Sequence, residues 1–328
     1  MKIAEFESIL ANRREERVAS RLGDITVADD ASVLQLGSDV FALDDAAERT
    51  LASYLRIPHN YLAACPPEFK ATTIRFWQEQ NAEAETILEL LDGNVVSIHG
   101  PDTLMIPMRR VVEVAGNVFD SDAQVRWHYM DETRLHLDVT TPQHAVDVQS
   151  PVYRKVGDIT EAGLRFLAYP NQVKPPSVCA YMERLACTNG MTTTEKAGQI
   201  SLRGRTVDEV IEEMEEAARR LMGSLDSRLE RYASTAQMPI PGNRQAFAHQ
   251  MAREARLTRS VLDVVMELVN QLPEDATLYD MNQVFTSVAN TDVSYATRNR
   301  LQTLGGYMAF EPERIVARCN TCQHPLEV

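Results

Sequence analysis

The sequence predicts an α+β fold, with a β-rich central domain between an α-helical N-terminal segment and an α-helical C-terminal half. Three observations predict it. Short β-branched segments separated by turn residues cluster in residues 86–205. Apolar residues recur at helical spacing through residues 206–328. The 328 residues are 44% hydrophobic and 24% charged, which suffices for a packed core without disulfides. We therefore expect three regions, of which residues 1–85 form the first.

The N-terminal region is expected to combine helices with short strands. Residues 1–20 are predicted to form a helix with a strongly charged middle, and residues 25–27 and 32–36 are predicted strands. Asp44 is the predicted N-cap of the helix that follows. The two prolines at residues 66–67 open another helix, because proline is favoured in a first helical turn.

The central region is expected to be mostly strands. Residues 86–91, 94–98 and 102–106 are predicted strands, because Asp-Gly and Gly-Pro pairs separate them. Residues 124–129 and 134–139 alternate, which predicts a hairpin with one buried face and one wet face. In its second strand the apolar face holds Leu135, Leu137 and Val139, and the wet face holds Arg134, His136 and Asp138.

The C-terminal half is expected to be helical. Apolar residues at i, i+3, i+4 and i+7 predict one long amphipathic helix over residues 207–232, and residues 244–271, 278–289 and 293–308 are further predicted helices. Heavy charge flanks the apolar stripe of the first helix, as at a subunit interface. We therefore expect a homo-oligomer.

Composition and charge limit the environment and the partners. The net charge of −14 argues weakly against binding to nucleic-acid backbone, since phosphate binders are usually basic. The charge is uneven, however, because residues 244–259 carry four arginines and Arg298, Arg300, Arg314 and Arg318 follow. No apolar run of about 18 residues exists, the start has no signal core, and five cysteines make an odd, sparse set. We expect a cytoplasmic protein with no membrane partner.

Two motifs carry a resemblance to a known family. Residues 156–166 (VGDITEAGLRF) and residues 181–191 (YMERLACTNGM) resemble the phage/plasmid-like protein family, a domain of unknown function common in phages and mobile elements. Residues 55–77, 279–286 and 301–306 are similar to further helices of that family. The resemblance implies a phage or mobile-element setting, hence the host cytoplasm, and implies little chemistry.

The second motif contains two candidate nucleic-acid contacts, Arg184 and Asn189. Asn189-Gly190 suits a sharp chain reversal, because both residues tolerate positive φ. Arg184 and the amides near Asn189 either meet a phosphate or a base, or form a structural corner before the long helix. Lys196, Arg203 and Arg205 follow as a local cationic patch that either grips phosphate or belongs to a solvated loop.

Arg126 and Trp127 are candidate contacts of a different kind. Aromatic side chains on a sheet can stack nucleic-acid bases, at roughly 1–3 kcal/mol per base. The alternative is that these aromatic residues belong to the core. Strict alternation puts Arg126 and His128 on one face and Trp127 and Tyr129 on the other, so only one pair can be wet.

The C-terminal tail contains half of a zinc site. Cys319 and Cys322 have the C-x₂-C spacing of a zinc knuckle, and His324 is a third candidate ligand. A fourth ligand would have to come from Cys65, Cys179, a distant histidine or another subunit. The alternative is a reduced tail without metal. No other cofactor is predicted.

Complete catalytic motifs are absent from the sequence: it contains no P-loop, no G-x-G-x-x-G after a strand, no H-E-x-x-H and no G-x-S-x-G. We therefore expect a non-catalytic phage protein of DNA metabolism, such as an ATP-independent single-stranded DNA-binding or annealing protein. One alternative is an acidic factor that binds a phage or host protein, for host takeover or anti-defence. The other is a metal-dependent nuclease, for which Asp138, His136 and Asp147 are the nearest approach to a cluster.

Overall fold

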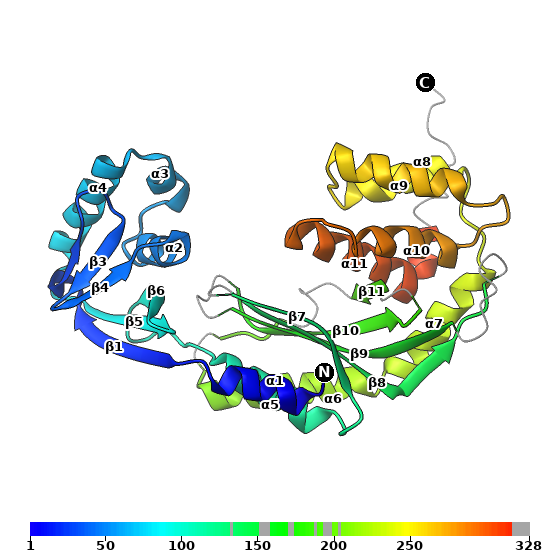
Figure 1. The fold of residues 1–328 in the computed structure, drawn as a ribbon, viewed down its shortest axis with the longest axis horizontal. Helices are drawn as coiled ribbons and strands as arrows, with labels where there is room; N and C mark the ends of the chain where they lie inside the picture. The colour runs from blue at the N-terminus through cyan, green and yellow to red at the C-terminus, as the bar shows by residue number, and fades with distance from the viewer. Residues whose placement is uncertain are drawn as a thin grey trace.

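The computed structural model describes residues 1–131, 134–150, 158–169, 174–186, 189–192, 199–202 and 205–316. It confirms the α+β class and the β-rich centre. The molecule is elongated and curved, with a small α/β unit at one end and a sheet between two helical layers at the other (Figure 1). Residues 317–328 lie outside the described residues, and with them Cys319, Cys322 and His324.

The small unit, which we call the N-terminal unit, combines two sheets with three helices. One sheet has the order β1-β5-β6, and the other has the order β2-β3-β4. Asp44 caps the first helix as predicted, since its carboxylate accepts a hydrogen bond from Ala47 N at 2.9 Å. The elements are β1 (Glu15–Arg21), β2 (Ile25–Val27), β3 (Val33–Leu36), β4 (Asp39–Ala42), α2 (Asp45–Tyr54), α3 (His59–Ala64), α4 (Pro67–Gln80), β5 (Glu85–Leu91) and β6 (Asn94–His99).

Two predictions for residues 1–106 were wrong, and strand pairing also crosses one predicted boundary. The predicted helix over residues 1–20 ends early: α1 spans Ile3–Ala11, and the charged stretch forms β1, whose seven residues pair with β5. The boundary predicted after residue 85 separates these two paired strands, so the N-terminal unit continues to His99. Residues 102–106, all within the described part of the chain, form no strand.

The larger unit is built on an antiparallel sheet of the order β11-β10-β9-β8-β7. Leu135, Leu137 and Val139 share the apolar face, as predicted, and pack with α1, α5 and α6 in one core cluster. Figure 1 shows these three helices on one side of the sheet and α8 to α11 on the other. The elements are α5 (Met108–Val118), β7 (Gln124–Met130), β8 (Leu135–Asp147), β9 (Ile159–Ala168), β10 (Ser177–Arg184), β11 (Asn189–Thr192) and α6 (Val207–Met222).

The opposite face of the hairpin was predicted to be wet, and it is buried. His136 is 1% exposed and Asp138 is fully buried, because α11 (Tyr295–Phe310) lies over this face. Polar side chains are tolerated there because they bind one another, as described below. We call this the polar face of the sheet.

Two of the four helices predicted for the C-terminal half are divided, and the other two, α10 (Leu278–Val288) and α11, form close to their predicted ranges. The helix expected over residues 207–232 is divided at Gly223 into α6 and α7 (Leu225–Ser234). The helix expected over residues 244–271 is divided at Arg256, whose φ of 52° ends α8 (Arg244–Glu254) before α9 (Arg259–Gln271). None of the helices in the described residues is long and apolar enough to cross a bilayer.

The apolar stripe of α6 does not support the predicted homo-oligomer. Val210, Ile211, Met214 and Ala218 are buried against α5 and the apolar face of the sheet within the same chain. The stripe is therefore part of the molecule's own core. Its flanking charge is the solvent-facing side of an ordinary amphipathic helix.

Candidate nucleic-acid interface

A buried ion pair lies at the centre of the polar face. Arg165 of β9 donates to both carboxylate oxygens of Asp138, at 2.6 and 2.7 Å. Burial alone would raise the pKa of Asp138, but Arg165 and His136 beside it hold that pKa below its ordinary value. Arg165 also donates to Gln302 at 2.6 Å and to Asn299 at 2.9 Å. The pair therefore joins β8 and β9 to α11.

His136 connects this ion pair to the protein surface. Its Nε2 lies 2.9 Å from Asp138 Oδ1, and its Nδ1 lies 2.9 Å from the hydroxyl oxygen of Tyr295 on α11. The imidazole also meets Trp127 edge to face, with ring centroids 4.4 Å apart. These contacts orient both Trp127 and Tyr295 from below, which fixes the position of two aromatic rings before any ligand arrives.

Three aromatic side chains gather above His136, and we call them the aromatic platform: Trp127 and Tyr129 of β7, and Tyr295. The centroid of Trp127 is 6.2 Å from each tyrosine, and the two tyrosines are 5.3 Å apart. The plane of Trp127 makes angles of only 10° and 24° with those of Tyr129 and Tyr295, so it is stacked with both, whereas the two tyrosines are tilted by 33°. Tyr129 is 37% exposed, and the other two are half-buried.

Two arginines lie over the platform. The guanidinium carbon of Arg298 is 5.5 Å from the Trp127 centroid, and that of Arg134 is 4.6 Å from the Tyr295 centroid. Both distances are within cation–π range. The site thus combines flat aromatic surfaces with positive charge at the edge strand of the sheet.

A β-bulge changes the faces predicted for this strand. The register shifts between Val125 and Trp127, so Arg126 and Trp127 both project to the polar face. There Arg126 donates to Thr140 at 2.8 Å and to Glu161 at 2.5 Å. His128 packs 5.0 Å from Phe6 of α1, on the opposite face. The predicted pairing of Arg126 with His128 on one face was therefore wrong.

One carboxyl near Arg126 has an unusual protonation equilibrium. Glu183 of β10 is 5% exposed, and burial raises its pKa to about 7. Arg126 lowers this pKa, but the negative charge of Asp138 raises it further. The hydroxyl of Tyr181 donates to Glu183 Oε2 at 3.2 Å. The polar face therefore contains a carboxyl that titrates near neutral pH.

Arg184, a predicted phosphate contact, is buried at 4% exposure. Its guanidinium donates to both carboxylate oxygens of Asp158, and its Nη1 donates to Gln283 of α10 at 3.3 Å. Tyr279 donates to the same carboxylate at 3.0 Å. The structure thus supports the alternative interpretation of this motif as a structural corner. Asn189 begins β11 and pairs in register with Arg184.

The predicted cationic patch is described only at Arg205. Its guanidinium forms an ion pair with Glu213 of α6, and its side chain is 36% exposed. Lys196 and Arg203 lie outside the described residues. Arg205 binds Glu213 of α6, whereas Arg184 binds Asp158 beside β9 and Gln283 of α10, so the structure does not unite them into one site.

The nuclease hypothesis depended on Asp138, His136 and Asp147. Asp138 is held by Arg165, and Asp147 is the last residue of β8, nine positions further along the strand. Within the described ranges, no three His, Cys, Asp or Glu side chains are placed to hold a metal ion. Cys179 is buried and Cys65 is half-buried, and neither belongs to such a group in the described residues.

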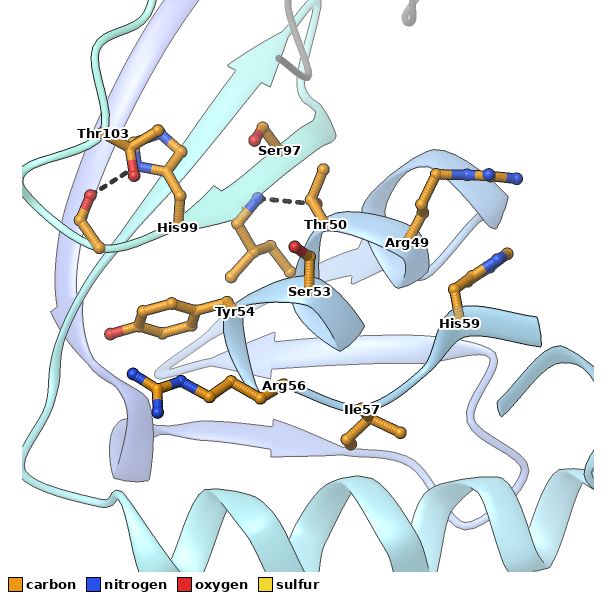
Figure 2. Close-up of a pocket in the computed structure, with 12 residues that line it drawn as sticks. Arg49, Thr50, Ser53, Tyr54, Arg56, Ile57, His59, Ser97, His99 and Thr103 are labelled. Atoms are coloured by element: carbon orange, nitrogen blue, oxygen red, sulfur yellow. Dashed lines mark hydrogen bonds between the residues drawn. The ribbon is translucent and has the colours of Figure 1, made fainter. Parts of the chain in front are cut away.

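The N-terminal unit contains a second candidate site, a cavity of about 640 Å³ beside α2 and β6. Figure 2 shows Thr50, Ser53 and Tyr54 of α2 near Ser97 and His99 of β6. The amide of Ile98 donates to Thr50 Oγ1 at 3.0 Å, which joins the two elements (Figure 2).

Carboxylates lie beside three of the four basic side chains that line this cavity, and Arg56 is the fourth. Arg49 lies 3.1 Å from Asp45, and His99 lies 3.3 Å from Glu89. His59 lies 3.6 Å from the same Asp45. The cavity is therefore poorly suited to an anion, and the aromatic platform is the stronger candidate site.

Sequence reasoning found Trp127 and Tyr129 but missed Tyr295 and Arg134 as their neighbours. Tyr295 is 168 positions from Trp127, and no local pattern connects α11 with β7. Arg298 was noted only as part of an uneven charge distribution. No model of a known protein family, no curated protein and no solved structure matches the chain.

Proposed function

We propose that the protein binds single-stranded nucleic acid, without catalysis, by stacking bases on the aromatic platform. The observation that carries the proposal is the set of three aromatic rings, with Trp127 stacked with both tyrosines and two arginines over them, at a partly exposed sheet edge. Unpaired bases offer both faces for such stacking, whereas the bases of a duplex are already stacked.

The net charge of the chain is −14, which disfavours phosphate binding, but arginines supply positive charge at the platform itself. Beyond Arg298, α11 presents Arg300 to a cavity of about 420 Å³ that Arg256 also lines. Arg298 and Arg134, at 5.5 and 4.6 Å from platform rings, lie within one Debye length of the platform, which is about 10 Å at 0.1 M salt. A strand stacked on the platform would meet them with its phosphates.

The resemblance to a phage and mobile-element family agrees with a role in DNA metabolism, including single-strand annealing. Annealing needs exposed bases and no nucleotide hydrolysis, which fits a chain without a P-loop. Single-stranded DNA is accordingly the partner that we propose first.

Tryptophan fluorescence tests the proposal directly. The chain has two tryptophans, so Trp77→Phe leaves Trp127 as the single reporter. We expect a short single-stranded oligonucleotide to quench this fluorescence at low salt. Tyr129→Ala should weaken binding about 5- to 150-fold, from about 1–3 kcal/mol of lost stacking.

Tyr61→Ala is the matched control, because Tyr61 is 50% exposed on α3 in the N-terminal unit. This variant should bind as the parent protein does. If no oligonucleotide changes the emission of Trp127 or the anisotropy of a labelled strand, the proposal fails. The protein-partner hypothesis would then take its place.

A further inference from the structure

A second cavity, which we call the arginine pocket, lies where α6 and α7 meet the C-terminal half of α11. Its volume is about 690 Å³. This is within the range of about 300–1,000 Å³ that is usual for small-molecule sites. The residues that line it include Arg220, Ser224, Arg228, Arg231, Tyr307 and Phe310.

Arg228 and Arg231 are one turn apart on α7 and have few partners. Arg228 Nε donates to Ser224 Oγ at 3.0 Å, and its guanidinium carbon lies 5.4 Å from the Phe310 ring centroid. Arg231 Nη1 donates to the carbonyl oxygen of Phe310 at 3.0 Å. Among the residues that the structure describes, neither arginine has a carboxylate within ion-pair distance.

These contacts leave most of the donors unused. A guanidinium has five N–H groups, and each of the two arginines has one hydrogen bond to the protein in the described residues. The nearest acids are already engaged: Glu311 accepts from Arg314 at 2.6 Å, and Glu216 lies 3.5 Å from Arg220. The pocket therefore carries an excess of positive charge in a chain of net charge −14.

This arrangement is electrostatically unfavourable when the pocket is empty. Burial lowers the pKa of Arg228, and the charge of Arg231 lowers it further, against a smaller opposing effect of Glu311. Arg231 is explained in part as a cap for the last carbonyl of α11, since cations are favourable at a helix C-terminus. Arg228 is half-buried beside a like charge, and capping does not account for it.

We infer that the arginine pocket binds the phosphate group of a nucleotide, with Arg228 and Arg231 on the phosphate and the base against the apolar wall. Leu221, Tyr307 and Phe310 form that wall. Paired guanidinium groups match the oxygens of a phosphate in geometry and charge. This site is separate from the aromatic platform, so the inference goes beyond the proposed function.

Two ligands would offer the same phosphate and base to this pocket. One is a free mononucleotide, and the other is a nucleotide unit of a bound single strand. Thr303 and Tyr307 line both the arginine pocket and the cavity of Arg256 and Arg300. The two cavities therefore adjoin along α11, on the same helix as the platform.

Calorimetric titration at low salt tests the inference with three probes: inorganic phosphate, a nucleoside monophosphate and a short single-stranded oligonucleotide. We expect the monophosphate to bind the wild-type chain. Arg228→Gln with Arg231→Gln should lose at least about tenfold in affinity, because charge-assisted hydrogen bonds are removed. Arg14→Gln with Arg21→Gln is the matched control, since Arg14 immediately precedes β1, Arg21 ends it and both side chains are exposed, and it should bind normally.

The Tyr129→Ala variant distinguishes the two sites. It should keep monophosphate binding while it loses affinity for the oligonucleotide, whereas the double arginine variant should lose the monophosphate. Monophosphate binding with no response to the oligonucleotide would support the pocket and identify the free nucleotide as its ligand. If the wild type binds neither phosphate nor monophosphate, or if the double variant binds as well as the wild type, the inference is overturned.

A measurement on the wild-type chain tests the inference even if the double arginine variant does not fold. Phenylglyoxal modifies accessible arginines, and mass spectrometry reports which ones. Nucleoside monophosphate should protect Arg228 and Arg231 severalfold while Arg14 and Arg21 react as before. Equal modification with and without the nucleotide would also overturn the inference.

Discussion

At the scale of single residues, the polar face shows how burial changes ordinary side chains. Asp138 and Arg165 are both fully buried, and each satisfies the other in a bidentate pair. Removing one member of such a pair usually costs more than the pair contributes, because the remaining charge is left unpaired. Among the described residues Glu183 has no such bidentate partner, and burial raises the pKa of its carboxyl to about 7.

Glu183 makes the stability of the protein depend on pH. Its pKa is about 7 in the folded chain, above the ordinary 4.5. A raised carboxyl pKa stabilises the folded state below pH 4.5, and this contribution is lost as the pH rises through 7. Glu183→Gln has no proton to lose, so its stability relative to wild type should rise by up to about 3 kcal/mol between pH 4.5 and pH 8.

Urea denaturation at pH 5 and pH 8 measures this difference. The sign of the change is informative: the free energy of unfolding of Glu183→Gln, relative to that of the wild type, should be higher at pH 8 than at pH 5. A difference between the two proteins that is the same at both pH values would mean that Glu183 is ionised throughout this range.

At the scale of elements, the contact of α11 with β11 depends on glycine. A Cβ built at Gly306 would lie 1.8 Å from the carbonyl oxygen of Thr192, and one at Gly305 would lie 2.4 Å from the methyl group of Thr286. The helix can therefore approach the edge strand to backbone contact. The same approach brings Gln302 to Arg165 and sets the position of Tyr295 three turns earlier in the platform.

Gly306→Ala should therefore destabilise the protein, although alanine is the better helix former by about 1 kcal/mol. The backbone of β11 cannot yield as a side-chain end can, so α11 must move away from the sheet. We expect a loss of about 2–4 kcal/mol in the free energy of unfolding, as for other overpacked sites, and weaker quenching of Trp127 by an oligonucleotide.

Gly223→Ala provides the control. Gly223 caps α6 with a φ of −62°, and the nearest atoms to a Cβ there are 3.7 Å away. This variant should be as stable as the wild type or slightly more so. Equal behaviour of the two alanine variants in urea denaturation would show that the contact of α11 with β11 is not close.

At the scale of the whole molecule, the chain starts on the larger unit and passes twice between the two units. Met1 pairs with the backbone of Val125, α1 packs on α5, and β1 then leads out to the N-terminal unit. The chain returns after β6 through residues 100–107. One core cluster lies within the N-terminal unit, whereas the cluster that holds the apolar stripe of α6 belongs mainly to the larger unit and also includes Leu91 of β5 and Val96 of β6.

Because this stripe is internal, Met214→Ala should reduce stability and leave the molar mass in solution unchanged. Met214 is fully buried, and such a truncation costs about 2–5 kcal/mol. Val264→Ala on α9 is the control, because Val264 is 43% exposed and its loss should cost no more than about 0.5 kcal/mol. If light scattering shows a smaller molar mass for Met214→Ala than for the wild type, the apolar stripe of α6 lies at a subunit interface.

Local sequence was sufficient where the cause is local. The proline-initiated α4, the Asp44 cap and the apolar face of β8 all follow from propensity, capping and period. Two strong local patterns predicted the wrong element. The charged stretch of β1 has the composition of a helix, but it pairs with β5 as a strand. The amphipathic period of residues 207–232 predicts one continuous helix, but the helix is divided at Gly223.

The sequence by itself determined the fold class, the β-rich centre and an aromatic strand with stacking potential. Only the tertiary structure decided which face of that strand is covered and what completes it. The bulge at Arg126, the descent of α11 onto β11 and the approach of Tyr295 to Trp127 are interactions between residues far apart in the chain. No short-range period encodes them, because their energy is gained only when distant elements pack.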